Sequence, residues 1–547
     1  MKKLLLTFIL IFCISTQSFS QCAENPQPKV LLVGDSWAFF MSVDQTINTV
    51  FSKWGHSDCT FYTNLTLAEN GAETDDFLTP AKQNEILAKL DEYPSIEFIH
   101  LSIGGNDALG DWNISYTQEQ TDTLIEDISQ RLLDVISFIK NARPNIKIFW
   151  SGYVYPNFGE VIETSVLGEN HPFFGTWDGM GQPTFQQIND ILNVFSHRAE
   201  VYADTTDNVD YVSCPGLLQY TFGQPDPLGV LPAGSYPAFT QPLPFGDPSY
   251  PSPKESMRDY GITKDCFHLS PKGYRDFIGY HTQKYYHKAL MHDFYAVADS
   301  VPLNGSLSAN GSVSELLRMG ELNSGNYASV LTFNLATLAD TGIAKASIFI
   351  RREELAGETP INSAMQVKIK AGYFGSSIAL ETADLLAQPS AQGTPCIFGT
   401  NQNDGDWVRL ELPDYFYPYL QAGNWVQFIL EAPTATSGSV LFSNGSTEPD
   451  FSPVLDITYG PKTVGVAEVK NDVLVDVYPN PTTGQLNFNS NLPLANCVVQ
   501  LHDITGRLML STVLTANNLD IATLPAGVYS LQVIAAKGVF NKKIVKN

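Results

Sequence analysis

Strand-like and helix-like segments alternate from about residue 29 to 297, and this alternation constrains the fold more than any other feature. Short runs rich in Val, Ile and aromatic residues include KVLLVGDS, IEFIHLSIGG and IKIFWSGY. Longer stretches between them, such as QTDTLIEDISQRLLDVISFIK, carry apolar residues three and four positions apart. A chain that alternates strand and helix in this way forms a parallel sheet with helices on both faces. The pattern therefore predicts an α/β domain.

The pattern changes after about Val301, where helical periodicity fades. Short alternating segments such as KASIFIRR and NWVQFILEA follow, bounded by Gly, Asn, Ser and Pro, which is typical of a β-sandwich or jelly roll. A chain of 547 residues is also too long for one hydrophobic core. We predict an α/β domain over residues 21–298, a β jelly roll over 299–461, a linker over 462–472 and a small β-sandwich over 473–547.

The first twenty residues, MKKLLLTFILIFCISTQSFS, have the pattern of a signal peptide. Lys2 and Lys3 precede an apolar run, and small residues flank the expected cleavage site. Cys22 raises the alternative of a lipidated N-terminus, but Gln21 stands where such signals have a small residue. No later apolar run is long enough to cross a membrane. We expect an exported protein without a membrane span.

The composition excludes some partners. Hydrophobic residues make up 44% of the chain and charged residues 16%, which is typical of globular domains. The net charge of −25 and a pI of about 4.6 argue against binding to nucleic acids or to anionic membrane surfaces.

The first predicted strand ends in Gly34-Asp35-Ser36, at the edge of the sheet where open α/β folds bind their ligands. A serine before a helix is usually an N-cap, so capping is one interpretation of Ser36. The other interpretation is a nucleophile, which requires a base near its hydroxyl group. His268, with Asp265 three residues before it, is a candidate base. Ser270 and Pro271 then predict the start of a helix, so we expect His268 on a loop just ahead of that helix.

Two further segments end strands at the same edge. Asn106 follows Gly104 and Gly105 after the third strand, and Gly71 follows the second strand. The Asn106 amide and the N–H groups of Gly71 and Ser36 are three donors of the kind that stabilise an oxyanion. The sequence contains no Gly-x-Ser-x-Gly elbow and no metal-binding His or Cys motif, so we expect neither a metal nor a cofactor.

These blocks (GDS, a Gly after the second strand, GGND, and DxxH near the domain end) resemble the SGNH (GDSL-like) hydrolases in content and order, over roughly residues 29–295. The resemblance implies a three-layer, flavodoxin-like α/β fold. It also implies Ser36 as nucleophile, His268 as base, Asp265 as its orienting acid, and Ser36, Gly71 and Asn106 as the oxyanion hole. Trp37 replaces the Leu of the family's name motif, which alters the pocket rather than the chemistry.

The two C-terminal regions also resemble known modules. The segment around LNSGNYASVLTFNLATLADTGIAKASIFIRR resembles the DNRLRE-type jelly-roll modules of bacterial extracellular proteins, some of which bind polysaccharide; a carbohydrate-binding module and a spacer remain open alternatives. The motifs VYPNPTTGQLNF, DITGRLML and LPAGVYSLQV resemble the type A sorting domain of the type IX secretion system of Bacteroidetes. This resemblance implies that residues 473–547 engage the secretion machinery, and that the protein is secreted or displayed on the cell surface.

Together these features predict a secreted serine ester hydrolase that acts through an acyl-enzyme on an ester substrate. We expect two long loops, over about residues 156–183 and 214–260. A carbohydrate O-acyl ester, in particular an acetyl ester, fits the jelly roll and the aromatic residues of these loops. We expect Trp37, Phe173 and Trp177 to contact the substrate. A lipase or lysophospholipase acting on lipid esters is the alternative. An adhesion or polysaccharide-binding protein is an alternative of another class, against which the complete set of candidate catalytic residues argues.

Four cysteines of the predicted α/β domain allow three disulfide pairings. Cys22 and Cys59 precede strands and belong at the amino edge of the sheet, whereas Cys214 and Cys266 belong at the carboxyl edge. A five-residue strand separates the edges by about 17 Å, beyond the roughly 7 Å that a disulfide tolerates between α-carbons. We therefore predict the bonds Cys22–Cys59 and Cys214–Cys266. Cys396 and Cys497, each alone in its domain, are expected to be buried free thiols.

Overall fold

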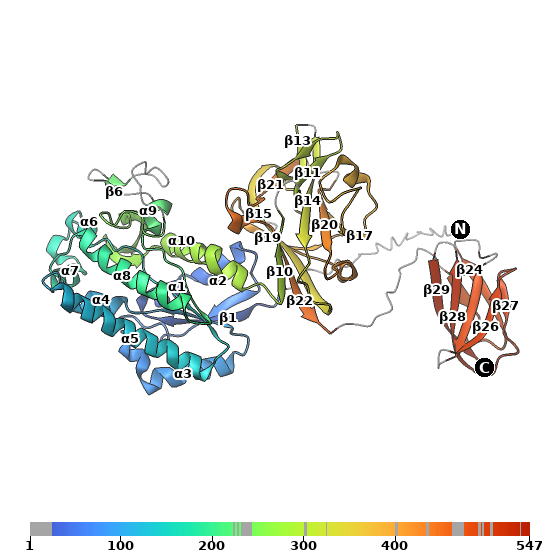
Figure 1. The fold of residues 1–547 in the computed structure, drawn as a ribbon, viewed down its shortest axis with the longest axis horizontal. Coiled ribbons are helices and arrows are strands. Elements are labelled where there is room, and N and C mark those ends of the chain that lie inside the picture. The colour runs from blue at the N-terminus through green and yellow to red at the C-terminus, as the bar shows by residue number, and fades with distance from the viewer. Residues whose placement is uncertain are drawn as a thin grey trace, which may run out of the picture. The chain divides into compact units, whose positions relative to one another are not determined.

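The computed structural model describes residues 24–222, 225–226, 229–230, 243–299, 303–323, 325–399, 403–433, 437–461, 475–490, 494, 497–503, 507–535 and 538–547. The predicted signal peptide, Cys22 and the linker over residues 462–472 lie outside these ranges. The chain divides into two compact units, Met1–Pro461 and Lys462–Asn547. The first unit contains both an α/β domain and a β-sandwich (Figure 1).

A five-stranded sheet forms the centre of the α/β domain, and all of its neighbouring strands run parallel. Its order is β2-β1-β3-β4-β5, with bounds β1 Gln27–Gly34, β2 Cys59–Tyr62, β3 Phe98–Ser102, β4 Lys147–Trp150 and β5 Val209–Tyr211. Strand β2 is thus added on one side of β1, whereas β3, β4 and β5 follow on the other side, so the direction in which strands are added changes next to β1. Ligand sites of open α/β sheets lie at the carboxyl ends of the strands that flank such a switch point.

Helices cover both faces of this sheet because successive side chains of a buried strand point to opposite sides. Val30 and Leu32 pack against α1, α2 and α10, whereas Leu31 and Val33 pack against α3 and α5. The helices are α1 Ser36–Val43, α2 Thr46–Lys53, α3 Pro80–Glu92, α4 Gly105–Asp111, α5 Gln118–Ala142, α6 Phe158–Glu163, α7 Phe174–Gly179, α8 Phe185–Asp204, α9 Leu217–Thr221, α10 Pro271–His281 and α11 His287–Ala289. This arrangement confirms the predicted α/β class.

The two long segments that we expected to be loops contain regular structure. Residues 156–183 include α6 and α7, and residues 214–260 include α9, the short pair β6 Pro225–Asp226 and β7 Gly229–Val230, and β8 Met257–Tyr260. Strand β8 pairs antiparallel with β9, Thr263–Leu269, outside the main sheet. Dense Pro and Gly hid these short elements, since each element is only two to six residues long.

The named strands described after residue 293 pair antiparallel, as predicted for the β domains. Its longer strands are β10 Phe294–Val297, β13 Leu317–Leu322, β14 Gly325–Asn334, β15 Gly342–Gly357, β16 Gln366–Ala371, β19 Trp407–Glu411, β20 Trp425–Glu431, β21 Gly438–Phe442 and β22 Val454–Gly460. Shorter strands are β11 Gly305–Ser308, β12 Val313–Ser314, β17 Ala391–Gly393 and β18 Cys396–Phe398. Strand β10 pairs with β22, so residues 294–297 belong to the β-sandwich rather than to the α/β domain.

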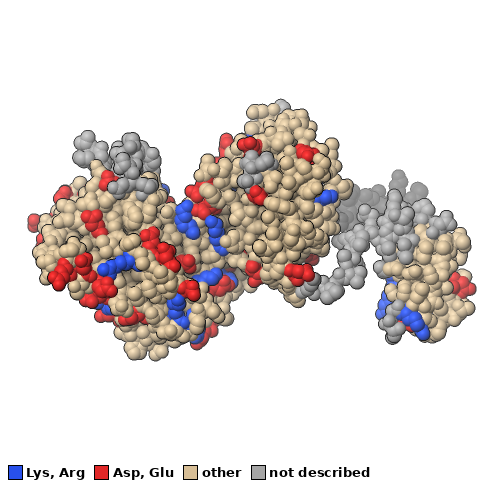
Figure 2. All heavy atoms as spheres, viewed as in Figure 1, with Lys and Arg blue, Asp and Glu red and all other residues tan. Residues whose placement is uncertain are grey.

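The β-sandwich packs closely against the α/β domain. Trp54 after α2 stacks on Trp407 of β19 with ring centroids 5.4 Å apart, and Phe349 and Val454 complete a shared apolar cluster. Basic side chains gather where the two domains meet (Figure 2). Lys284 and Lys288, for example, both pair with Asp450. The two domains therefore share one buried interface.

The C-terminal unit is a second, smaller β-sandwich. One sheet contains β23 Val475–Tyr478, β24 Gln485–Ser490 and β27 Asn518–Asp520, and the other contains β25 Val498–Asp503, β26 Leu508–Val513, β28 Gly527–Ala535 and β29 Gly538–Lys546. Buried apolar residues of both sheets, among them Leu486, Val499 and Leu531, form its core.

Two kinds of feature are not found within the described ranges. No described helix is long and apolar enough to cross a membrane. The same residues include no group of three or more His, Cys, Asp or Glu side chains that could hold a metal ion.

Candidate active site

The turn after β1 presents Ser36 at the carboxyl edge of the sheet. Gly34 approaches β3 so closely that a Cβ there would lie 1.8 Å from the Ser102 carbonyl oxygen, which explains the glycine. The Asp35 N–H donates to the same carbonyl, and the Asp35 carboxylate accepts from the Trp37 N–H at 2.9 Å. Asp35 is thus the N-cap of α1, and Ser36 is the first residue of the helix. Because the cap is Asp35, the Ser36 hydroxyl group is not needed for capping.

The structure brings Ser36, His268 and Asp265 together in one chain of hydrogen bonds. Ser36 Oγ lies 2.7 Å from His268 Nε2, and His268 Nδ1 lies 2.8 Å from Asp265 Oδ2. Asp265 Oδ1 also accepts from the backbone N–H groups of Phe267 and His268, at 3.0 and 2.9 Å. The exposed fractions of Ser36, Asp265 and His268 are 6%, 1% and 8%. The three side chains are therefore aligned and largely shielded from solvent.

His268 lies near the end of strand β9, not on a loop as we expected. The β8–β9 pairing holds this strand, and Ser270 then caps α10 by accepting from the Gly273 N–H at 3.1 Å. Pro271 occupies the first helical position, as predicted. Regular structure on both sides of His268 fixes the imidazole more firmly than a free loop would.

Asn106 and Gly71 both lie on segments that are tied to the Ser36 turn or to each other. The Asn106 amide donates one hydrogen to the Ala72 carbonyl at 2.9 Å, and its other hydrogen remains available to a ligand. Gly71 has a φ of +81°, which favours glycine. Its segment is held beside β1 because the Glu69 N–H donates to the Gly34 carbonyl at 3.0 Å. The N–H of Ser36 lies in the first turn of α1, where helical N–H groups lack intrahelical acceptors.

A buried tyrosine connects the Ser36 turn to the Asn106 segment, and sequence reasoning missed it. The Tyr153 hydroxyl donates to Asp35 Oδ2 at 2.6 Å and accepts from the Gly105 N–H at 3.0 Å. Burial raises the pKa of Asp35 to about 6, although the Tyr153 hydrogen bond opposes this shift. Burial also raises the pKa of Tyr153. Tyr153 follows the end of β4, and this position after a strand was the only feature of the sequence that could have placed it near the site.

A second network anchors the Asn106 segment from behind. Asp107 is buried and accepts from the Thr74 N–H and hydroxyl groups, at 3.0 and 2.6 Å. Arg131 of α5 donates to both Asp107 and the Thr74 hydroxyl. These bonds join the segments after β2 and β3, which carry the two candidate oxyanion donors outside α1.

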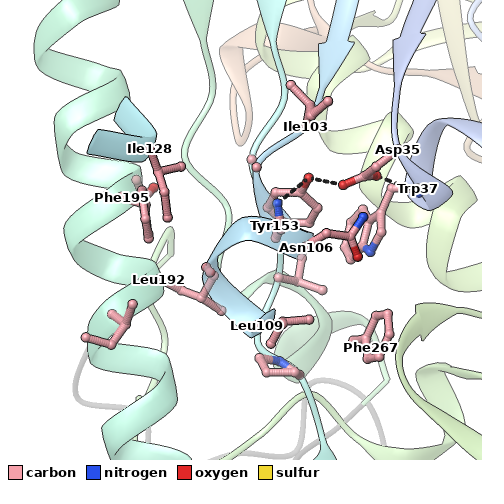
Figure 3. Close-up of a pocket in the computed structure, with 18 of the residues that line it drawn as sticks. Asp35, Trp37, Ile103, Asn106, Leu109, Ile128, Tyr153, Leu192, Phe195 and Phe267 are labelled. Atoms are coloured by element: carbon pink, nitrogen blue, oxygen red, sulfur yellow. Dashed lines mark hydrogen bonds between the residues drawn. The ribbon is translucent and has the colours of Figure 1, made fainter. Parts of the chain in front are cut away.

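A cavity opens beside Ser36 and Asn106 and continues between the sheet, α4, α5 and α8. Figure 3 shows Asp35, Trp37, Asn106 and Tyr153 on one side of it and Leu192 and Phe195 on the other. Most of its lining is apolar, including Leu109, Ile128 and Phe267. A reacting group on Ser36 would therefore border an apolar space.

The three aromatic residues predicted to contact substrate have different surroundings. Trp37 is 3% exposed, lines the cavity and packs edge-on against Tyr153 and Phe277. Phe173 packs against Phe267, 5.1 Å between ring centroids, with the His268 ring 6.4 Å away. Trp177 is buried, donates its indole N–H to the Pro183 carbonyl, and is not among the described residues that line the cavity. Trp37 and Phe173 are thus near the site, whereas Trp177 supports the surrounding fold.

The predicted disulfides of the α/β domain are wrong. Cys59, Cys214 and Cys266 are buried free thiols, and Cys22 lies outside the described residues. Strand β5 ends at Tyr211, so Cys214 lies beyond it, and its sulfur is 3.4 Å from His281 Nε2 on α10. Cys266 lies in β9, whose partner is β8 and not β5. Assigning both cysteines to one sheet edge was therefore too simple.

The cysteines of the two β domains differ in their bonding. Cys497 is a buried free thiol, as expected, but Cys396 is disulfide-bonded. The expectation for Cys396 rested on its being alone in its domain. That argument fails because the β-sandwich and the α/β domain form one compact unit, so a cysteine's partner need not come from its own domain.

Solved structures that resemble the N-terminal half of the chain share little sequence with it. They include family 3 carbohydrate esterases from Talaromyces cellulolyticus (11% identity, 48% of this chain and 99% of that chain, TM-score 0.28) and Clostridium thermocellum (17%, 48% and 98%, 0.26), and a GDSL-like lipase from Bacteroides thetaiotaomicron (16%, 48% and 88%, 0.26). No curated protein matches the chain.

The C-terminal unit has a specific match. Residues 476–547 match the family described as the secretion system C-terminal sorting domain, which confirms the predicted resemblance. A sorting domain of this type indicates secretion or attachment to the cell surface. Residues 476–547 are therefore a C-terminal sorting domain, which follows the α/β domain and the β-sandwich in the sequence.

Proposed function

We propose that the α/β domain is a serine carboxylic ester hydrolase that acts through an acyl-enzyme. The observation that carries this proposal is the hydrogen-bonded chain from Ser36 Oγ to His268 Nε2 and from His268 Nδ1 to Asp265 Oδ2. A nucleophile, a base and an orienting carboxylate in this order are the components of a catalytic triad.

In the first step, Ser36 Oγ attacks the ester carbonyl carbon while His268 Nε2 takes the hydroxyl proton. The Asp265 carboxylate accepts from Nδ1, which fixes the tautomer and stabilises the imidazolium that forms. His268 then gives the proton to the alcohol oxygen as the carbonyl–oxygen bond breaks. The alcohol leaves, and the acyl group remains on Ser36.

The negative charge that develops on the carbonyl oxygen is stabilised by the Ser36 and Gly71 N–H groups and the Asn106 amide. Donors that are already fixed need no reorganisation during the reaction, which makes such sites effective. The Ala72 carbonyl holds the Asn106 amide, and the Asp107–Arg131–Thr74 network holds the segments on either side.

In the second step, water enters on the side of His268, which removes its proton as the oxygen attacks the acyl carbon. The same oxyanion donors act again, and His268 returns the proton to Ser36 Oγ as the bond between Oγ and the acyl carbon breaks, which releases the carboxylic acid. His268 gives back each proton within the step in which it takes it. The side chains of Ser36, His268 and Asp265 therefore supply the acid–base chemistry of both steps.

Two classes of ester remain candidate substrates. A carbohydrate O-acyl ester is the first, because a β-sandwich packs directly against the α/β domain and the sorting domain takes the protein out of the cell. A lipid ester is the second, because the apolar cavity beside Ser36 suits the long acyl chain of such an ester. Trp37 and Phe173, which lie near the reacting groups, contact the substrate in either case.

The test replaces Ser36 by alanine in the full chain and measures hydrolysis of p-nitrophenyl esters, acetylated xylan and a lysophospholipid. Ser36→Ala is expected to abolish turnover of every substrate that the wild-type protein hydrolyses. Ser42→Ala, on the same helix, is the matched control and retains activity. A fluorophosphonate probe should label Ser36 in the wild-type protein, as located by peptide mass. Undiminished hydrolysis by Ser36→Ala contradicts the proposal.

A further inference from the structure

The apolar cavity beside Ser36 is deeper than the proposed reaction requires. It begins at Ser36 and Asn106, passes Leu109 of α4, and continues to Ala199 near the end of α8. Lining residues on α8 extend from Ile188 to Ala199. At 1.5 Å per residue this is on the order of 16 Å of helix, far more than an acetyl group occupies.

The lining offers little to a polar ligand. The only charged side chain among the lining residues described is Asp35, and both of its oxygens already accept hydrogen bonds, from Trp37 and Tyr153. At the inner end, Ser196 Oγ lies 2.8 Å from the Tyr211 hydroxyl and 2.7 Å from Ser213 Oγ, so these groups are paired with one another. A sugar placed here would leave its hydroxyl groups without partners, which is costly.

The position of His268 decides which half of the ester this cavity holds. The leaving alcohol must lie next to His268 Nε2, because that nitrogen protonates it. His268 is not among the described residues that line the cavity, whereas Ser36 and Asn106 are. The part of the substrate that stays on Ser36, beside an oxyanion donor, is the acyl group. The cavity therefore lies on the acyl side of the reacting carbon.

We propose that this cavity is an acyl-chain site, so that the enzyme prefers esters of medium-length, linear, unsubstituted acids to acetyl esters. The inference rests on the proposed ester hydrolase function and adds the class of its acyl group. It says nothing of the alcohol, which can be a sugar or a glycerol derivative. Each further methylene group of the acyl chain should raise kcat/KM about fourfold, until the chain is longer than the cavity.

The first measurement is kcat/KM of the full chain for p-nitrophenyl esters from acetate to decanoate, below their micelle concentrations. We expect hexanoate to exceed acetate by at least about tenfold. Leu192, which points into the cavity in Figure 3, provides the variant. Leu192→Trp should lower the ratio of kcat/KM for hexanoate to kcat/KM for acetate at least about tenfold. Val194→Trp, at a 40% exposed position of the same helix, should change neither value.

A second measurement needs no variant. Alkyl phosphonate p-nitrophenyl esters react with Ser36 in the wild-type protein, and the rate of labelling should rise with alkyl length from methyl to hexyl. This readout remains if Leu192→Trp does not fold.

The outcomes separate the two proposals. Ser36-dependent hydrolysis of acetate without a gain for longer acids overturns the acyl-chain site and leaves the hydrolase intact. A preference for hexanoate that survives in Leu192→Trp also overturns it, since the chain then binds elsewhere. Absence of hydrolysis of every ester overturns the hydrolase itself.

Discussion

The two edges of the five-stranded sheet bury polar groups in different ways. At the carboxyl edge, Ser36, Asp35 and Asn106 border a cavity that a ligand can enter. At the amino edge, before β1 and β2, polar groups are covered by the β-sandwich. There Arg409 of β19, 3% exposed, pairs with Glu24 and Asp58. Burial is common to both edges, so burial alone does not identify a reactive site.

The amino edge also holds a buried histidine pair. His56 Nε2 lies 3.0 Å from His287 Nδ1, and the rings of Trp407 and Phe349 pack against them. Burial and the charge of Arg409 lower the pKa of His56 to about 3. Burial likewise lowers the pKa of His287. The two rings bond to each other, and neither histidine is among the described residues that line the cavity at Ser36.

The edges should therefore respond oppositely to substitution. A change at the carboxyl edge alters turnover, whereas a change at the amino edge alters the packing of two domains. They should also respond oppositely to pH, because burial raises the pKa of Asp35 and lowers that of His56.

Outside Ser36, His268 and Asp265, the largest effect is expected for Asn106→Ala. Loss of one oxyanion donor should lower kcat about 10²–10³-fold, with a smaller effect on KM, because the hydrogen bond strengthens in the transition state. Steady-state kinetics of the purified protein measure it. Asn48→Ala is the control: this asparagine of α2 accepts from the Phe61 N–H, and its loss should lower stability but not kcat. Equal effects of both variants on kcat would contradict the comparison.

The next effect concerns the pH dependence of stability at the carboxyl edge. The folded-state pKa of Asp35 is about 6, above its usual value of 3.8, so the folded protein binds more protons in this range. Its stabilising contribution is complete below pH 3.8 and is lost as the pH rises through about 6. Relative to Asp35→Asn, the wild-type free energy of unfolding should therefore fall by about 3 kcal/mol between pH 3.8 and pH 7.

Urea unfolding at several pH values, followed by circular dichroism, provides these free energies. If the difference in the free energy of unfolding between wild type and Asp35→Asn is the same at every pH, folding does not raise the pKa of Asp35.

The opposite sign is expected at the amino edge. The pKa of His56 falls from 6.5 to about 3 on folding, so its neutral form contributes stability above pH 6.5 that is lost as the pH falls. At pH 5 the loss should be about 2 kcal/mol relative to pH 8, and His56→Gln should remove it. The stacked pair Trp54–Trp407 reports on this interface, so tryptophan fluorescence follows the transition. Acid stability of His56→Gln equal to that of wild type would contradict the assignment.

Part of the carboxyl edge could be predicted because Ser36, Gly71 and Asn106 each follow a strand in the sequence. The order of strands and helices predicted that these three residues would lie at one edge, whereas His268 was selected as a candidate base and expected on a loop. Local patterns also predicted the helix start at Ser270. Residues of this kind need only the sheet topology to be placed.

Other features depend on packing between distant segments, and the sequence carries no local signal for them. The Tyr153 bridge joins two turns, and the cavity forms only when α4 and α8 pack around the sheet. The free thiols Cys214 and Cys266 show the same limit, since their predicted pairing treated a two-stranded hairpin as part of the main edge. The β10–β22 pairing also crosses the predicted domain boundary.

The smallest effect is expected for Tyr153→Phe, which tests whether the carboxyl edge works as one connected unit. The variant keeps the ring that packs against Trp37 and removes only the hydroxyl between Asp35 and Gly105. Loss of these two hydrogen bonds should lower the free energy of unfolding by about 1.5 kcal/mol.

The functional part of that prediction separates positioning from stability. Without the bridge, the Asn106 segment is held less firmly to the Ser36 turn, so kcat should fall severalfold at unchanged KM. A group that only stabilises the fold would lower the fraction of active enzyme on heating but not kcat at low temperature. Tyr211→Phe is the matched control, because its hydroxyl lies 2.8 Å from Ser196 at the far end of the cavity and has no bond to the reacting groups. Measured on the acetate ester, which does not reach that far, kcat of Tyr211→Phe should equal that of wild type. A Tyr153→Phe enzyme with wild-type kcat would show that Asp35 and the Asn106 segment are held independently.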